Sequence, residues 1–313
     1  MLNRILLAIA VAATIAAATA VGVWAERRWG APAQTASRRL LVGALYTLSP
    51  FVTFFNVARL HVDANIAGGL ALGIVMLVLV GGAAWFVGAR LLRLQRPQQG
   101  SLIASVMQAN TGYVGLPLAL VLLGSSQLGA GAAYDALVTN PVLFLGVFGV
   151  GAAFGERAGE GVAERLRAFV LRNPPLIAAV AALLAPVSLA PDALVDASRV
   201  AVIAFVPLGF FAVGVTLAQE SEEGALPFPP PLTPPVAGAI VLRLLVAPAV
   251  LVALAAPLVT LPDAYLLMAA MPTGINTLVV AHVYGLDLRI AAGAIAWSTT
   301  IVVAAGVAVA LLT

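Results

Sequence analysis

Two short polar segments interrupt an otherwise apolar chain of 313 residues. They read "QANTGYVGLPL" and "MPTGINTLVV", and each combines an asparagine, a Thr-Gly pair and a proline. The residues concerned are Asn110, Thr111, Gly112 and Pro117 in the first segment, and Pro272, Thr273 and Asn276 in the second. A side-chain amide both donates and accepts hydrogen bonds. Proline inside a helix costs about 3 kcal/mol and glycine about 1 kcal/mol relative to alanine, so we expect a helix to break near Pro117 and near Pro272.

The composition indicates that these breaks lie in a membrane. The chain is 62% hydrophobic and 9% charged, and its mean hydropathy is +1.07. A free backbone group in lipid costs several kcal/mol, so a broken helix survives there only inside protein or beside a water-filled cavity. Interrupted helices at corresponding positions of two halves are typical of a transporter binding site. Close helix packing by small residues is the competing interpretation of each segment alone.

The residue inventory argues against several other functions. The chain has no cysteine, and its two histidines, His61 and His282, are far apart. No cluster has metal-ligand spacing, and no Gly-rich phosphate loop follows a predicted strand. The basic residues are all arginines spread between apolar stretches, which favours topology signals over nucleic-acid binding. We therefore expect no metal, no cofactor, no nucleic-acid partner and no enzymatic activity.

Apolar stretches predict ten transmembrane helices. A helix needs about 20 mostly apolar residues to cross the hydrocarbon core. The predicted segments are 3–24, 40–58, 66–92, 101–123, 130–154, 174–190, 194–218, 236–259, 263–284 and 288–312. The first stretch also resembles a signal peptide. Because it is long enough to span, we interpret it as a retained helix.

The arginine distribution predicts the orientation. With the N-terminus outside, twelve arginines fall in cytoplasmic loops, namely 27, 28, 38, 39, 90, 93, 96, 157, 165, 167, 172 and 289. Three arginines, Arg4, Arg59 and Arg199, fall outside. Positively charged loops stay in the cytoplasm, so both termini are predicted to be outside the inner (plasma) membrane. The acidic, proline-rich loop "QESEEGALPFPPPLTPP" is the exception, and acidic residues contribute little to this rule.

Ten helices divide into two groups of five. Residues 1–157 form the first predicted repeat, residues 158–173 a cytoplasmic amphipathic connector, and residues 174–313 the second repeat. Thr111-Gly112 and Thr273-Gly274 are 162 residues apart and both fall in the fourth helix of their half. An odd number of spans in each half makes the second repeat inverted. The predicted fold is therefore all-α, with broken helices 4 and 9.

Two charged residues fall within predicted spans. Asp135, in "AAYDALVTNPVLF", has Thr139 one turn away on the same face and Asn140-Pro141 after it. An intramembrane carboxylate usually faces a cavity or a partner, so Asp135 is a candidate for proton or cation coupling. Hydration near the outer end is the alternative. Arg243 could attract an anion, but we favour a side chain that extends to the cytoplasmic interface.

These segments resemble those of the auxin efflux carrier family. "ANTGYVGLPL" and "MPTGINTLVVAHVYGLD" are similar to its two signature segments, and "LRNPPLIAAVAALL" and "FVPLGFFAVGVTLA" are also similar. The resemblance implies ten helices in two inverted groups of five, a fold like that of bile-acid sodium symporters and sodium/proton antiporters. It also implies that the fourth and ninth helices cross, with Asn110, Pro117, Pro272 and Asn276 at the crossing. Gly274-Ile275 and Ser49-Pro50 depart from the expected pattern, and the long central loop of plant members is missing.

The resemblance implies a secondary transporter of a small organic anion, auxin-like or a mono- or dicarboxylate, that works by alternating access. A sodium-coupled bile-acid-type symporter and a channel of the same topology are the alternatives, and an intramembrane enzyme lacks a visible acid/base constellation. The expected partners are the anion, a coupling proton or sodium ion, and the lipid bilayer. A homodimer is left open.

Overall fold

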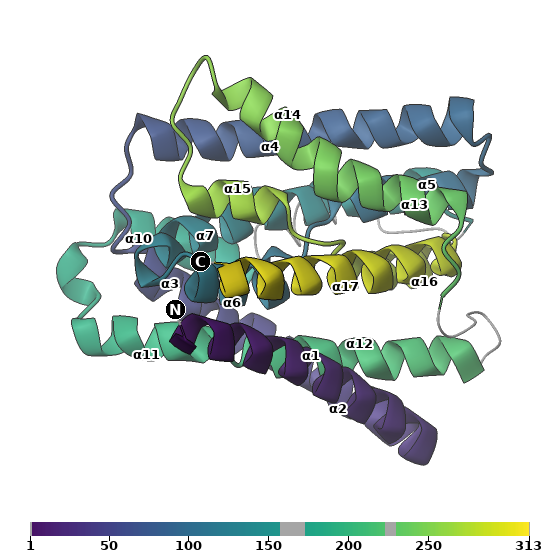
Figure 1. Cartoon of the computed structure of the whole chain (residues 1–313), viewed down its shortest axis with the longest axis horizontal. Coiled ribbons are helices and arrows are strands. Elements are labelled where there is room, and N and C mark those ends of the chain that lie inside the picture. The colour runs from purple at the N-terminus through teal and green to yellow at the C-terminus, as the bar shows by residue number, and fades with distance from the viewer. Residues whose placement is uncertain (1, 157–172, 223–229, 313) are drawn as a thin grey trace.

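The protein is helical throughout the part that the structure describes. The computed structural model describes residues 2–156, 173–222 and 230–312. Within these residues there is no strand, and the helices run side by side along one long axis (Figure 1). The helices of the first half are α1 (Leu2–Trp29), α2 (Ala31–Gly43), α3 (Ser49–Val57), α4 (Ala64–Phe86), α5 (Arg96–Met107), α6 (Leu116–Leu122), α7 (Leu128–Tyr134) and α8 (Phe148–Phe154). Those of the second half are α10 (Pro174–Leu184), α11 (Asp192–Val202), α12 (Phe205–Glu222), α13 (Pro234–Val241), α14 (Ala247–Ala255), α15 (Asp263–Ala269), α16 (Asn276–Tyr284) and α17 (Leu288–Leu312).

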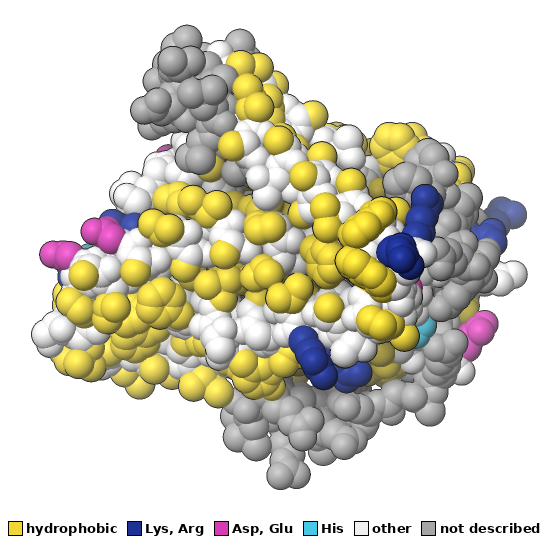
Figure 2. Space-filling view, turned by 90° about the horizontal axis from the view of Figure 1, so that it is seen from below, with side chains coloured by type: hydrophobic (Ala, Val, Ile, Leu, Met, Phe, Trp, Pro, Cys, Tyr) yellow, Lys and Arg dark blue, Asp and Glu magenta, His cyan; other side chains and the backbone are white. Residues whose placement is uncertain are grey.

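Six continuous helical stretches are long and apolar enough to cross a membrane. They are Ala31–Val57, Ala64–Leu91, Ser125–Phe154, Asp192–Gln219, Pro234–Ala255 and Leu288–Val309. Large apolar side chains also cover much of the protein surface, and Figure 2 shows them spread over one face of the molecule with few charged side chains among them. Because exposed apolar surface of this extent is unfavourable in water, the protein is a membrane protein.

Four predicted segments are not among these six stretches. The first of them, α1, is a continuous helix of 28 residues. The fourth and ninth predicted segments are each divided into two shorter helices, α5 and α6, and α15 and α16. Helix α10, in the sixth predicted segment, has 11 residues and ends before Pro186. The predicted connector 158–173 lies outside the described residues except for Asn173, whose side chain accepts a hydrogen bond from the Leu176 N–H and so caps α10.

Widened turns precede four of the prolines. The π-helical turns Ala44–Leu48 (η1), Thr111–Gly115 (η3), Asp135–Thr139 (η5) and Leu242–Val246 (η8) end two residues before Pro50, Pro117, Pro141 and Pro248 respectively. Proline has no N–H to donate, and its ring clashes with the preceding turn. A turn with i→i+5 hydrogen bonds absorbs that defect without ending the helix. These prolines therefore modify helices more than they break them.

Polar contacts connect the loops at each end of the bundle. At one end, the Arg59 side chain donates to the Ala190 carbonyl and pairs with Asp192 at 2.8 Å, which links the end of α3 to the start of α11. At the opposite end, Arg96 donates to the Ala153 carbonyl at 2.6 Å, which links the start of α5 to the end of α8. Helix α1 begins and α17 ends toward the same end of the bundle (Figure 1).

Helices α1 and α12 pack with almost no space between their backbones. A Cβ atom at Gly22 would lie 2.2 Å from the Phe211 carbonyl oxygen, and one at Gly214 would lie 2.1 Å from the Thr19 carbonyl oxygen. Both distances are far below van der Waals contact, so each position accepts only glycine. In lipid there is no hydrophobic driving force between helices, so their association depends on close van der Waals packing. Small residues such as these glycines allow that close packing.

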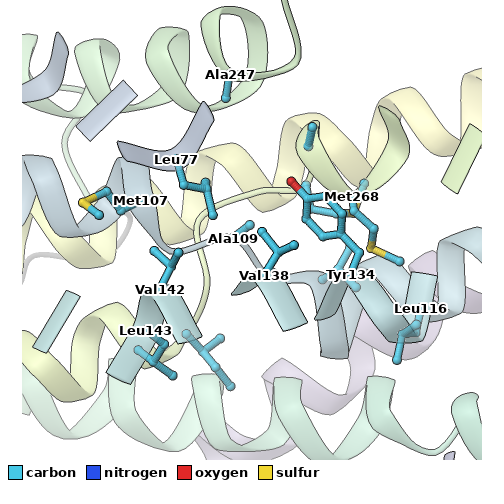
Figure 3. Packing of buried hydrophobic residues seen from close by; sticks show 14 of the residues in the cluster. Leu77, Met107, Ala109, Leu116, Tyr134, Val138, Val142, Leu143, Ala247 and Met268 are labelled. Atoms are coloured by element: carbon cyan, nitrogen blue, oxygen red, sulfur yellow. The ribbon is translucent and has the colours of Figure 1, made fainter. Parts of the chain in front are cut away.

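The interior of the bundle is one large apolar cluster. Figure 3 shows part of it around the ends of the interrupted helices, where Met107 of α5, Tyr134 of α7 and Met268 of α15 belong to the same cluster. Tyr134 and Met268 are almost completely buried, and the ring of Tyr134 packs against that of Tyr265 with 5.3 Å between ring centroids. The polar groups described next therefore lie in a tightly packed environment.

Candidate functional site

The two interrupted helices meet at their breaks. Helix α5 ends at Met107 and helix α15 ends at Ala269. The extended residues that follow pair as an isolated antiparallel bridge between Ala109 and Thr273. The Asn110 N–H donates to the Pro272 carbonyl at 2.8 Å, and the Gly274 N–H donates to the Gln108 carbonyl at 2.8 Å. Backbone groups freed by the breaks thus satisfy one another, as a low-dielectric interior requires.

Thr273 connects this bridge to two further helices. It is fully buried, and its hydroxyl donates to the Ser105 carbonyl of α5 at 2.9 Å. Its N–H donates to the Ser298 hydroxyl of α17 at 3.0 Å. Both polar groups of Thr273 are therefore used to hold the break in place, and neither is free to bind a ligand.

A cavity of about 70 Å³ lies beside the paired breaks. Its lining residues come from both breaks and from neighbouring helices: Leu45, Ser49, Gln108, Ala109, Asn110, Gly112, Tyr113, Asp135, Thr139, Asn140, Pro175, Phe205, Gly274, Ile275 and Asn276. A volume of this size holds several water molecules or a small polar group, since a single water needs roughly 10–15 Å³ by the same measure.

Asp135 carries the acidic group of this cavity. The residue is 8% exposed, and its carboxylate accepts a hydrogen bond from the Thr111 hydroxyl at 2.5 Å. Gly112 lies against it, because a Cβ atom there would be 3.5 Å from Asp135 Oδ1. The structure therefore places Asp135 on the cavity beside the first break, in agreement with the cavity-facing interpretation.

Several polar atoms of the lining have no hydrogen-bond partner within the described residues. They are Gln108 Oε1, Asn110 Nδ2 and Thr139 Oγ1, all fully buried. A buried polar atom left without a partner costs about 1–3 kcal/mol, so such atoms are normally satisfied by water or by a ligand. The three atoms give the cavity the polarity of a site for a hydrogen-bonding ligand.

The predicted site residues divide into two groups. Asn110, Gly112, Asp135 and Asn276 line the cavity, and Asn276 begins helix α16. Thr111, Pro272 and Thr273 do not line the cavity but form hydrogen bonds with residues around it. The Thr111 hydroxyl donates to Asp135, and the Pro272 carbonyl accepts from the Asn110 N–H. Thr273 forms hydrogen bonds with Ser105 of α5 and Ser298 of α17.

Pro117 does not mark a break. It is buried within the first turn of α6, preceded by the π-helical turn η3, and the extended backbone lies seven or more residues earlier, at Gln108–Asn110. The prediction that the chain breaks near Pro117 is therefore wrong in position, although the prediction that Pro272 lies in a break is confirmed. The widened turn supplies the reason, because it accommodates the missing proline N–H.

The structure adds residues that were not among the predicted site residues. Gln108, Tyr113 and Gly274 line the cavity, and the Ser298 hydroxyl of α17 accepts a hydrogen bond from the Thr273 N–H in the second break. Gln108 and Tyr113 belong to the first polar segment, so the sequence could have indicated them as site residues. Ser298 stands in an apolar helix at a distance of 25 residues from its partner, so no local pattern could indicate its role.

Arg243 does not extend to an interface. Its side chain is completely buried, and its guanidinium donates to the Val106 carbonyl at 2.9 Å and to the Ala269 carbonyl. The expectation of a solvated side chain is therefore wrong. Its burial is favourable because the broken helices provide carbonyls without an intrahelical partner, and the guanidinium donates to them.

The broken, paired helices and the apolar surface define a class of protein, an α-helical membrane protein with a polar cavity at interrupted helices. Residues 165–309 match the family described as "Membrane transport protein". An uncharacterized transporter from Methanocaldococcus jannaschii is 25% identical over 270 residues, which is 82% of this chain and 83% of the relative. Both matches confirm the resemblance to transporters of the auxin efflux carrier type that the sequence shows. They point to a transporter and not to an enzyme.

Proposed function

We propose that the protein is a secondary transporter that moves a small organic anion across the cytoplasmic membrane by alternating access. The arrangement would be ten spans in two inverted groups of five, residues 1–157 and 174–313, with both termini outside. The observation that carries this proposal is the antiparallel pairing of the two breaks next to a polar cavity. Transporters with inverted repeats bind their substrate between interrupted helices of this kind.

The cavity also has features that suit an anion. Helix α16 begins at Asn276, which lines the cavity together with Gly274 and Ile275. The N-terminal end of a helix carries a partial positive charge and free N–H groups, both of which favour an anionic ligand. Asn110, with an unpartnered side-chain N–H₂ group within the described residues, adds a donor from the opposite break.

Asp135 suggests how transport is coupled. A carboxylate ligand in this cavity would lie beside the Asp135 carboxylate, and two like charges in a low-dielectric site disfavour each other. Protonation of Asp135 removes that repulsion. We therefore infer that the anion binds together with a proton, which favours proton coupling over a sodium-coupled mechanism of the bile-acid type.

The first experiment is a search for the ligand. The purified protein is screened by thermal unfolding against mono- and dicarboxylates at several pH values, because a ligand that binds the native state raises its apparent stability. A ligand found in this way is then tested for saturable uptake and counterflow in vesicles. Counterflow is the property of a carrier, and flux without it would favour the channel alternative.

The second experiment tests the site. Asn110→Ala and Asn276→Ala each remove a hydrogen bond to a charged ligand, worth about 1.5–3 kcal/mol. The dissociation constant should rise about tenfold to a hundredfold. Asn65→Ala is the matched control, because Asn65 accepts a hydrogen bond from the Thr260 N–H in a distant loop. If both cavity variants bind as tightly as the parent protein, these asparagines only pack the crossing and the proposed site is wrong.

A further inference from the structure

Each break leaves backbone carbonyls that a continuous helix would have used. In an unbroken helix the carbonyl of Val106 would accept from the Asn110 N–H, and that of Ala269 from the Thr273 N–H. Here the Asn110 N–H donates to Pro272 and the Thr273 N–H donates to Ser298. Two carbonyls at two helix C-termini are thus released at the same place.

One side chain takes both of them. Arg243 belongs to the widened turn η8 of the span Pro234–Ala255, which packs beside α5. Its Nη1 donates to the Val106 carbonyl at 2.9 Å, and its Nη2 donates to the Ala269 carbonyl. The side chain is completely buried, and in the described residues it forms no ion pair with a carboxylate. Its positive charge is therefore balanced by carbonyl dipoles.

The location of this charge is informative. The C-terminal end of a helix carries a partial negative charge, so two such ends that meet make a favourable position for a cation. In transporters with broken helices, unwound carbonyls and half-helix C-termini are the groups that coordinate a coupling sodium ion. In this protein the guanidinium of Arg243 already occupies the equivalent electrostatic position.

We propose that Arg243 is a built-in cation of the crossing, a positioning residue that makes a bound metal cation between these two helix ends unnecessary. The guanidinium is attached to the chain, so it stabilises the two half-helices in every state of the cycle and cannot carry energy from an ion gradient. The proposal concerns the coupling ion of the proposed transport function, but its evidence is only the contact of Arg243 with the ends of α5 and α15. It can therefore fail or hold independently of the substrate site.

The test compares two substitutions of similar size. Arg243→Lys keeps a positive charge with fewer donors, and Arg243→Met removes the charge. Unfolding temperatures of the purified full chain are measured in detergent with sodium chloride or choline chloride of equal ionic strength. The parent should unfold at the same temperature in both salts. Arg243→Met should unfold several degrees lower than Arg243→Lys, since it leaves two buried carbonyls and two helix ends without a cation.

A third variant tests whether the position itself binds a cation. Arg243→Ala creates space at the two carbonyls, and millimolar guanidinium should raise its unfolding temperature in a saturable way relative to choline. Arg59→Ala is the matched control, since Arg59 also donates to a backbone carbonyl but lies at the periphery. Guanidinium should not stabilise that control or the parent.

Three results would overturn the proposal. The first is equal stability of Arg243→Lys and Arg243→Met, which would show that charge is irrelevant there. The second is stabilisation of the parent by sodium in a saturable way, which would show that a metal cation is still needed. The third is a failure of guanidinium to stabilise Arg243→Ala. Should Arg243→Ala not fold, the comparison of the lysine and methionine variants in the two salts decides the matter.

Discussion

The backbone N–H of Asn110 donates to the carbonyl of Pro272 at 2.8 Å, although 162 residues separate them in the chain. A second backbone hydrogen bond, from Gly274 to Gln108, completes the pair. Each break therefore stabilises the extended backbone of the other. Neither segment can become a continuous helix without the loss of both hydrogen bonds. This mutual support explains how polar backbone persists inside an apolar bundle.

The first prediction concerns Gly274. A Cβ atom there would lie 2.9 Å from Gln108 Cγ and 3.0 Å from the Ala109 carbonyl oxygen. Gly274→Ala should therefore push the two breaks apart and destabilise the protein by about 1–3 kcal/mol, the usual cost of overpacking. Thermal unfolding in detergent measures this effect. Gly82→Ala is the control, because a Cβ atom at Gly82 would meet nothing within 4 Å in α4 and should be neutral or slightly stabilising. Equal effects of the two substitutions would argue against a tight bridge.

The second prediction concerns Asp135 and pH. If a carboxylate ligand binds beside Asp135, affinity should be highest at low pH, where Asp135 is protonated, and should fall as the pH rises and the carboxylate ionises. Asp135→Asn keeps the shape of the side chain but cannot ionise. Its affinity should stay high across the range above the ligand's own ionisation. Binding is followed by the thermal shift at a series of pH values.

The control for this prediction is Asp263→Asn, an exposed carboxylate at the start of α15 that does not line the cavity. Tyr113 is the other titratable side chain of the lining, so Tyr113→Phe completes the set. A pH profile of Asp135→Asn identical to that of the parent would rule out proton coupling through this residue. If Tyr113→Phe alone changed the profile, the coupling group would be the tyrosine.

The polar breaks could be predicted from the sequence because they depend on local chemistry. The amides, the Thr-Gly pairs and Pro272 are polar or helix-breaking residues in apolar surroundings, and they stand out without any structure. The sequence predicts the first break near Pro117, whereas the structure has it seven or more residues earlier, at Gln108–Asn110. A single proline has two outcomes, a break or a widened turn, and the packing around it decides between them.

The contacts across the crossing could not be predicted from the sequence. Arg243 and Ser298 act on backbone groups of helices far away in the chain, so their roles depend on the three-dimensional arrangement. The sequence even favoured the opposite environment for Arg243, since isolated arginines in membrane spans usually extend toward water. Only the two carbonyls freed by the breaks make its complete burial favourable.

The third prediction concerns the contact between α1 and α12. At Gly214 any side chain would collide with the Thr19 carbonyl, which is backbone and cannot move aside like a flexible side chain. Gly214→Ala should therefore separate the two helices and lower the unfolding temperature by several degrees. Gly43→Ala, at the end of α2, would meet nothing within 4 Å and should have little effect. If Gly214→Ala unfolds at the temperature of the parent, the two helices are not in close contact in the membrane.

The fourth prediction concerns the orientation. Arginines gather at the helix ends and loops predicted to be cytoplasmic: Arg27 and Arg28 in the last turn of α1, Arg90 in the turn after α4, and Arg96 at the start of α5. Helix α1 begins and α17 ends toward the opposite end of the bundle (Figure 1). The positive-inside rule then places both termini outside. A reporter that is active only in the cytoplasm should be silent when fused after Thr313, and active when fused after Arg93 in a truncated chain. If the Thr313 and Arg93 fusions were both active, both points would be cytoplasmic and an even number of spans would lie between them. The predicted layout has an odd number there, so the division into two inverted groups of five would have to be abandoned.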